Sequence, residues 1–349
     1  FVEHRFNTFL VRMDLLAKGA EVKLKPDGSL ASQPDFSSMT ERLVRGKPHA
    51  KTFMFALGAP KRSWPCTDGS KIAYNSPEWR KGFTQWFRAF MDYLEGLGIG
   101  TDQWVWYPYD EAFPGKPPGD MWKRALQQAR LVHEINPKVQ FFMDAWSRNA
   151  AQLESWRGLN VIWCPDYGIY GQAPWKWLKE HQDAEGAPLW MYRCHEGTRG
   201  KNPHTFYRCR GWLSWIYDLD GMSYWNCMVH AASPWNDLDY KWGDNSTLLK
   251  GGPGGSLIDT LRHDAYRDGV EDYLYVRMLD ELLSKPGVDA QTVKEGRDLL
   301  KAASEEYRTI GDWGYLGELR KKWQLTEEIA ARTQAQRKQI AELIIKLNR

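Results

Sequence analysis

Two neighbouring carboxylates, Asp110 and Glu111, follow an aromatic segment that runs from Trp104 to Tyr109. A pair of carboxyl groups suits general acid and base catalysis, because one group donates a proton while the other carries negative charge. Successive residues of a strand point to opposite faces, so both groups reach one substrate only where the regular pleat has ended. Pro108 and the Phe-Pro-Gly sequence that follows Ala112 indicate such an end.

Other catalytic chemistries leave no pattern in this sequence. It contains no GxSxG, no HExxH and no P-loop signature, so the motifs of serine hydrolases, zinc proteases and P-loop nucleotide sites are absent. We expect no metal and no cofactor. The five cysteines, which form no CxxC pair, are expected to be buried free thiols, with a Cys194–Cys209 disulfide as the alternative for an exported protein; they are Cys66, Cys164, Cys194, Cys209 and Cys227.

The elements that must position the carboxylates alternate between strands and helices. Short segments rich in aromatic and β-branched residues predict strands at 6–13, 52–57, 103–109, 139–144, 160–165, 189–193 and 221–226. Helical patterns between many of them favour an α/β fold, specifically a (β/α)8 TIM barrel whose first strand is either upstream of this chain or atypical. We expect the catalytic barrel to span residues 1–255 and the last barrel helix with a C-terminal helical extension to span 256–349.

Helix boundaries are marked by capping residues. Ser76 followed by Pro77 predicts the start of a helix that ends at Gly96 or Gly98. Ser256, with Asp259 three residues later, predicts the start of the first C-terminal helix. Further helices are expected at 119–135, 150–156, 175–183 and 206–217.

In a barrel the active site forms at the carboxyl ends of the strands. The polar and aromatic residues at those positions are Arg12, Asp14, Asp110, Glu111, Asp144, Trp146, Asp166, Tyr167, Arg193, His195, Glu196, Trp225, Asn226 and His230. Acids, rings and a few cations on one rim match glycosidic bond cleavage, in which an acid protonates the leaving oxygen while negative charge supports an oxocarbenium-like centre.

The adjacency of the two acids favours a nucleophile supplied by the substrate. Glu111 would act as general acid and then as base, while Asp110 would orient a 2-acetamido group whose oxygen attacks to form an oxazolinium ion. One alternative makes Glu196 the nucleophile of a double-displacement glycosidase, with Glu111 as acid and base. A second alternative is a carbohydrate-binding barrel without turnover.

Composition supports a sugar ligand and argues against other partners. The 19 Trp, 16 Tyr and 13 Phe residues suit either a bulky core or stacking on pyranose rings. The formal net charge of +3 does not indicate a nucleic acid, and no apolar stretch approaches the roughly 18 residues of a membrane span. We therefore expect an oligosaccharide or glycoconjugate substrate, no nucleic acid and no membrane span; the sequence carries no signal for an oligomeric state.

Several segments together resemble glycoside hydrolase family 123, the β-N-acetylgalactosaminidases. They are 3–7, the Tyr-Asp-Glu at 109–111, 189–194, 210–215, 220–225, 233–235 and, most specifically, 256–273. The resemblance implies a (β/α)8 barrel, catalytic roles for Asp110 and Glu111, and substrate-assisted release of terminal β-linked GalNAc. Two features depart from the family: Ala112 stands where a proline is usual, and a preceding β-sandwich domain is missing from this chain.

The resemblance and the rim positions name further candidates. Residues expected to contact substrate are Arg5, Trp146, Tyr167, Tyr192, Trp225, Asn226 and Trp235, with Tyr167 or Tyr192 holding the acetamido group. The acid-rich motif 267–272 is expected to be structural because Arg267 and Glu271 have the spacing of a helix-surface pair. The chain begins without Met, so we expect a piece of a longer protein, exported if the missing part carries a signal.

Overall fold

The computed structural model describes residues 7–57, 63–115, 120–147, 149–166, 169, 173–192, 204–224, 248–250, 256–311 and 327–348. The chain divides into two compact units, Phe1–Leu189 and Trp190–Arg349, and each is considered by itself below. The domain boundary expected at residue 255 stays a prediction. Within the described ranges, no helix is both long enough and apolar enough to cross a membrane.

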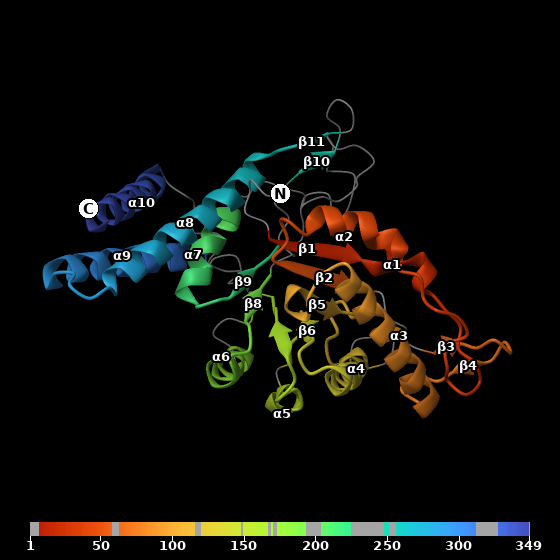
Figure 1. The fold of residues 1–349 in the computed structure, drawn as a ribbon. Coiled ribbons are helices and arrows are strands. Elements are labelled where there is room, and N and C mark those ends of the chain that lie inside the picture. Colours follow the sequence, from red (N-terminus) through yellow and green to blue (C-terminus); the bar gives the residue numbers. More distant parts are fainter. Residues whose placement is uncertain are drawn as a thin grey trace. The chain divides into compact units, whose positions relative to one another are not determined.

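A five-stranded parallel sheet forms the centre of the first unit (Figure 1). Its strand order is β1-β2-β5-β6-β7, so β5 is the central strand. The bounds are Thr8–Arg12 for β1, Thr52–Ala56 for β2, Trp104–Tyr107 for β5, Gln140–Met143 for β6 and Val161–Trp163 for β7. Each lies inside one of the segments that the sequence predicts as strands.

Helix α3 (Pro77–Gly96) covers the central strand of this sheet. Its Ser76 N-cap accepts a hydrogen bond from the Trp79 N–H, as the sequence predicts. The apolar side of α3 then packs on β5, where the rings of Phe87 and Trp106 meet edge to face with centroids 5.2 Å apart. This contact anchors the strand that leads to Asp110.

The other short elements complete the first unit. The helices are α1 (Met13–Leu16), α2 (Thr40–Gly46), α4 (Met121–Ile135, capped by Asp120), α5 (Ala150–Glu154) and α6 (Ala173–Glu185). The strands β3 (Trp64–Pro65) and β4 (Lys71–Ile72) pair antiparallel. The helical patterns in the sequence predict α4, α5 and α6, whereas α1, α2 and the β3–β4 pair have no counterpart among the predicted elements.

Most described tryptophans belong to the core. Those less than 2% exposed are Trp79, Trp86, Trp104, Trp106, Trp156, Trp163 and Trp212. A buried indole contributes a large apolar area to the core, which explains much of the tryptophan excess without a ligand. Of the two explanations offered by composition, the bulky core therefore accounts for these seven residues.

The second unit joins small strand pairs to long helices. β8 (Trp190–Met191) pairs parallel with β9 (Gly221–Met222), and β10 (Leu249–Lys250) pairs antiparallel with β11 (Leu257–Ile258). A short π-helix, His204–Arg208, leads into α7 (Cys209–Ile216), which is followed by α8 (Leu261–Leu283), α9 (Ala290–Gly311) and α10 (Glu327–Leu347).

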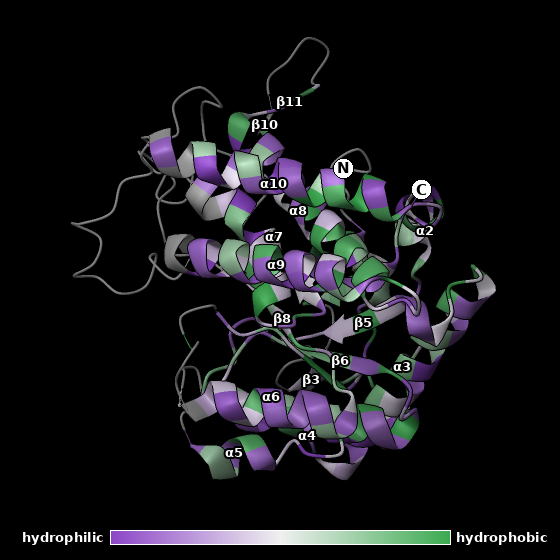
Figure 2. Ribbon diagram, turned by 90° about the vertical axis from the view of Figure 1, so that its left-hand side faces the viewer, coloured by the Kyte–Doolittle hydropathy of each residue, from purple (hydrophilic) through white to green (hydrophobic). Residues whose placement is uncertain are grey.

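Packing of these helices produces a separate apolar core. Trp212 of α7 stacks on Tyr307 of α9 with ring centroids 4.2 Å apart, and both side chains are buried. Val276 and Leu279 of α8 and Ile340 of α10 belong to the same cluster. Hydrophilic and hydrophobic residues alternate along these helices (Figure 2), as amphipathic helices require.

Of two expectations about the fold, the barrel is observed only in part and the helix cap at Ser256 is wrong. The sheet of the described first unit is open, with β1 and β7 at its edges, so a closed eight-stranded barrel is not observed. Beyond β7, the described residues of this unit add a single bridge, between Trp163 and Leu189. Ser256 is not a helix cap: residues 257 and 258 pair as a strand, and Thr260 caps α8 by accepting from His263 N–H.

Candidate active site

The regular pleat of β5 ends before the two carboxylates. The strand stops at Tyr107, and Pro108 has no N–H with which to continue the ladder. Asp110 is exposed, and Glu111 is half-buried with a φ of 45°, in the left-handed region that non-glycine residues seldom adopt. The strict alternation of faces therefore no longer applies to Asp110 and Glu111, which is the condition for both carboxyl groups to reach one substrate.

One phenol links Asp110 to a second carboxyl group. The Tyr107 hydroxyl oxygen lies 2.7 Å from Oδ1 of Asp110 and 2.5 Å from Oδ2 of Asp144. Tyr107 is the last residue of β5, and Asp144 directly follows β6, the neighbouring strand. The parallel pairing of these strands brings their carboxyl ends together and places all three side chains at that end of the sheet.

Asp144 also holds the backbone of Glu111. The Glu111 N–H donates to Asp144 Oδ1 at 2.9 Å and to Oδ2 at 3.1 Å. The Phe113 N–H then donates to the Glu111 carbonyl at 2.7 Å, which closes a tight turn over the fully buried Ala112. A proline at position 112 would disfavour the positive φ of Glu111, so alanine there is compatible with this conformation.

Burial sets the electrostatics of Asp144. Its side chain is only 5% exposed, and burial raises its pKa to about 7. The hydrogen bonds from Tyr107 and from the Glu111 N–H lower the pKa, whereas the negative charges of Asp110 and Glu111 raise it. Burial raises the pKa of Tyr107, and the charges of Asp144 and Asp110 raise it further. The Tyr107 phenol and, below about pH 7, the Asp144 carboxyl therefore keep their protons.

Arg12 supplies positive charge at the same carboxyl end of the sheet. It ends β1, in register with Ala56 of β2, which is in register with Tyr107 of β5. Its guanidinium donates to Asp14 at 2.8 and 2.7 Å. The hydrogen bond with Asp14 is the largest influence that raises the Arg12 pKa, and the charges of Asp14 and Asp110 add to it. Arg12 and Asp110 thus interact electrostatically.

The remaining predicted site residues divide into three groups. Trp146, two residues after Asp144, is half-buried and meets Phe113 edge to face at 5.9 Å, so it lies next to the turn that carries Glu111. Tyr192 is half-buried in the second unit. Outside the described residues lie Arg5, Tyr167, Trp225, Asn226, Trp235 and the alternative nucleophile Glu196.

The link that Tyr107 makes between Asp110 and Asp144 is absent from the sequence predictions. Tyr107 lies inside a predicted aromatic strand, and Asp144 is one of the polar residues at predicted strand ends. The available signal was positional: Tyr107 precedes Asp110 by three residues at the end of one predicted strand, and Asp144 ends the next. That Tyr107 and Asp144 share a hydrogen bond could not be read from a separation of 37 residues.

The described cysteines are free thiols. Cys66, Cys164 and Cys209 are buried and unpaired with another cysteine, as expected. Burial raises the pKa of Cys164, and the charges of Asp144 and Asp166 raise it further, so this thiol beside the cluster remains protonated. Cys194 and Cys227 lie outside the described residues.

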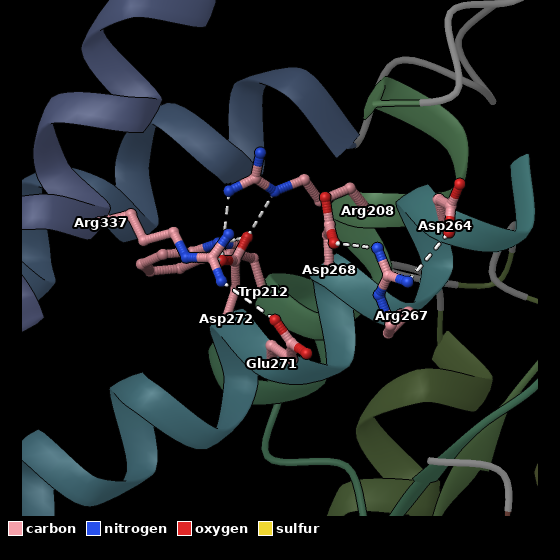
Figure 3. Close-up of polar contacts among 8 residues, drawn as sticks. All are labelled: Arg208, Trp212, Asp264, Arg267, Asp268, Glu271, Asp272 and Arg337. Carbon is pink, nitrogen blue, oxygen red and sulfur yellow. Dashed lines mark hydrogen bonds and ion pairs between the residues drawn. The ribbon is translucent and has the colours of Figure 1, made fainter. Parts of the chain in front are cut away.

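The acid-rich motif 267–272 occupies α8 in the second unit (Figure 3). Asp272 accepts from Arg208 Nε at 2.7 Å and Nη2 at 3.2 Å, from Trp212 Nε1 at 3.3 Å, and pairs with Arg337 Nε at 3.1 Å. Glu271 also pairs with Arg337, at 3.2 Å. These ion pairs and the Trp212 hydrogen bond join the π-helix, α7, α8 and α10.

The pairing within this motif differs from the expected one. Arg267 pairs with Asp264 at 3.0 Å and with Asp268 at 3.4 Å (Figure 3), whereas Glu271 turns toward Arg337 of α10. The i, i+4 spacing of Arg267 and Glu271 identified one helix face, but the tertiary contact with α10 provides the closer partner. The motif thus carries ion pairs between helices.

Comparison with known families identifies one family whose model covers this region. The model of the family described as "Glycoside hydrolase 123, catalytic domain" matches residues 63–279, a range that includes β5, Asp110, Glu111, Asp144 and the α8 motif. No protein with a curated description matches the sequence. Because the matched range covers well over half of the chain, the chain belongs to glycoside hydrolase family 123 and carries its catalytic domain.

Proposed function

We propose that this glycoside hydrolase is a retaining exo-β-N-acetylhexosaminidase that releases terminal β-linked GalNAc through substrate assistance. The observation that carries the proposal is the Asp110–Glu111 pair just beyond the central parallel strand, β5. In parallel α/β folds, catalytic groups gather at the carboxyl ends of the strands. The preference for GalNAc over GlcNAc rests on the family alone.

The proposed reaction assigns a separate task to each acid. Glu111 donates a proton to the glycosidic oxygen as the bond from C1 to that oxygen breaks. The carbonyl oxygen of the 2-acetamido group attacks C1 and forms an oxazolinium ion, whose positive charge the Asp110 carboxylate stabilises. Glu111 then removes a proton from water, which attacks C1 and restores the acetamido group with retained configuration.

The local geometry supports this division of tasks. Asp110 accepts a hydrogen bond from Tyr107, and its charge interacts with that of Arg12. Glu111 is half-buried on a backbone that Asp144 holds in place. A positioned, solvent-facing carboxylate beside a second, more enclosed carboxyl is the combination that the mechanism needs.

Further parts of the proposal go beyond the two acids. We infer that Trp146 and Tyr192 contact the sugar, together with Arg5, Tyr167, Trp225, Asn226 and Trp235. We also infer that the whole catalytic domain closes into a (β/α)8 barrel, of which the open parallel sheet is one part. These inferences rest on the family and on the positions of the residues at predicted strand ends.

A paired substrate assay tests the proposal. The enzyme should release 4-nitrophenol from the β-GalNAc glycoside faster than from the β-GlcNAc glycoside, and a thiazoline mimic of the oxazolinium ion should inhibit it. Equal or greater turnover of a β-galactoside, which lacks the acetamido group, together with no thiazoline inhibition, would overturn substrate assistance. That result would favour Glu196 as an enzymatic nucleophile.

A second assay separates catalysis from binding alone. If the chain only binds carbohydrate, no glycoside of the panel is hydrolysed, and Glu111→Gln leaves sugar binding unchanged. Calorimetric titration with free GalNAc, run on the wild type and on Glu111→Gln, gives this comparison. Hydrolysis by the wild type that disappears in Glu111→Gln excludes the binding-only alternative.

A further inference from the structure

If Asp110 and Asp144 are both ionised, the single hydrogen of the Tyr107 phenol is too few for the two short contacts that its oxygen makes. The phenol has one hydrogen, yet its oxygen lies within hydrogen-bond distance of Asp110 Oδ1 at 2.7 Å and of Asp144 Oδ2 at 2.5 Å. One hydrogen serves one short contact well, and the second contact then brings two oxygen lone pairs together. A proton on Asp144 Oδ2 resolves this conflict.

The surroundings of Asp144 make it the carboxyl that keeps the extra proton. Asp144 is 5% exposed, whereas Asp110 is exposed to solvent and close enough to Arg12 for their charges to interact. The titratable groups that face Asp144 are Tyr107, Asp110 and Glu111 from the end of β5, and Cys164 from the end of β7. The carboxylates among them repel a negative charge on Asp144.

We propose that Asp144 is a positioning residue that holds a proton and orients both catalytic acids, Asp110 through the Tyr107 hydroxyl and Glu111 through its backbone N–H. In this arrangement Asp144 Oδ2–H donates to Tyr107, Tyr107 donates to Asp110 Oδ1, and Asp144 Oδ1 accepts from the Glu111 N–H. The proposal rests on the catalytic roles proposed above for Asp110 and Glu111.

The arrangement has a functional consequence for the orientation of Asp110. Because Tyr107 receives a hydrogen from Asp144, its own hydrogen is committed to Asp110, which fixes the position of that carboxyl group. Ionisation of Asp144 releases this commitment and adds a further negative charge beside the two catalytic acids. Loss of the Asp144 proton should therefore lower activity, in the range near pH 7 that burial of this carboxyl sets.

The first test compares two replacements of Asp144. Asparagine imitates the protonated acid, because its amide nitrogen donates to Tyr107 and its oxygen accepts from the Glu111 N–H, whereas alanine does neither. With a 2,4-dinitrophenyl β-GalNAc glycoside at pH 5.5, we expect Asp144→Ala to lower kcat/KM about 100-fold, and Asp144→Asn to recover most of that loss. Equal losses in the two variants, or none in either, would overturn the proposal. Thermal melts verify that both variants are folded.

The second test assigns the pH dependence to Asp144. In Glu111→Gln the catalytic acid no longer titrates, and a dinitrophenolate leaving group needs no proton. We expect kcat/KM of this variant to fall as pH rises through about 7, and the fall to disappear in Glu111→Gln/Asp144→Asn. A fall that persists unchanged in the double variant contradicts a titrating Asp144.

An infrared measurement tests the proton without substrate. The C=O stretch of a protonated carboxyl should be present in the folded wild type at pH 6, decline as pH rises through about 7, and be absent in Asp144→Asn but retained in the exposed control Asp68→Asn. Absence of the band in active wild-type enzyme overturns this proposal alone. A band that behaves as expected in an enzyme inactive on β-GalNAc and β-GlcNAc glycosides would overturn only the proposed function.

Discussion

Two deeply buried aspartates of this protein have opposite surroundings. Asp144 lies at the carboxyl end of the first unit's sheet. The Tyr107 phenol links it to Asp110, and the Glu111 N–H links it to Glu111. Asp272, on α8 of the second unit, is 1% exposed and accepts from the guanidiniums of Arg208 and Arg337 (Figure 3). One site collects like charges, and the other matches opposite charges.

The difference separates a group suited to chemistry from a group suited to stability. Burial opposes the charge on Arg208, but the hydrogen bond and the charge of Asp272 outweigh it and raise the Arg208 pKa, so the guanidinium keeps its charge. Asp144 is instead poised to lose its proton near neutral pH. Perturbed carboxyls among other carboxyls are typical of active sites, whereas buried ion pairs commonly join elements of the fold.

The largest expected effect comes from the catalytic pair. Glu111→Gln should lower kcat/KM about 1,000-fold for a methyl β-GalNAc glycoside, because general acid catalysis contributes roughly that factor, and should affect a dinitrophenyl glycoside far less. Asp110→Asn should lower turnover of both substrates, since it destabilises the oxazolinium ion whatever the leaving group. Steady-state kinetics measures both variants. If both keep near-wild-type turnover, the catalytic assignment is wrong.

The matched ion pair should affect stability more than chemistry. Asp272→Asn leaves Arg208 and Arg337 without their shared carboxylate. We expect the free energy of unfolding, measured in urea, to fall by about 3–5 kcal/mol. Asp264→Asn, which removes a more exposed partner of Arg267 on the same helix, should cost under about 1 kcal/mol and serves as control. Equal costs for the two variants would show that the buried network contributes no more than an exposed pair.

Asp144 should make the stability of the protein fall with rising pH. Its pKa is about 7 in the fold against 3.8 for the ordinary side chain, so between these values the unfolded chain releases a proton that the fold retains. Wild-type stability should therefore decline from about pH 4 to pH 7, by up to about 4 kcal/mol from this group, and then level off. Asp144→Asn should remove this component. Urea unfolding at several pH values measures it, and an identical pH slope in both proteins contradicts it.

The smallest expected effect concerns the start of the helix that carries Asp272. Thr260→Ala removes the side chain that accepts from the His263 N–H and should cost about 1 kcal/mol, whereas Ser256→Ala, at the position first predicted as the cap, should change stability little. Thermal unfolding of the two variants compares them directly. The reverse order would restore Ser256 as the cap.

The periodic elements could be predicted because their signals are local. All seven segments predicted as strands contain strands, and Ser76 caps α3 as its sequence indicates. Ser256 failed as a cap because the two residues after it pair with 249 and 250, a contact that a local pattern does not contain. The tryptophan excess was ambiguous for a similar reason: a buried indole and a sugar-stacking indole have the same sequence signal.

The sequence by itself determined the chemical candidates: an Asp-Glu pair after an aromatic strand, in a chain with the motifs of family 123. Only the tertiary structure showed that Asp144 is linked to both members of that pair. It shares the Tyr107 hydroxyl with Asp110, and it accepts a hydrogen bond from the Glu111 N–H. The physical reason is that residue types and short-range spacing are written in the chain, whereas the pairing of parallel strands brings distant residues together. Burial at that meeting point then sets the charge that each carboxyl carries.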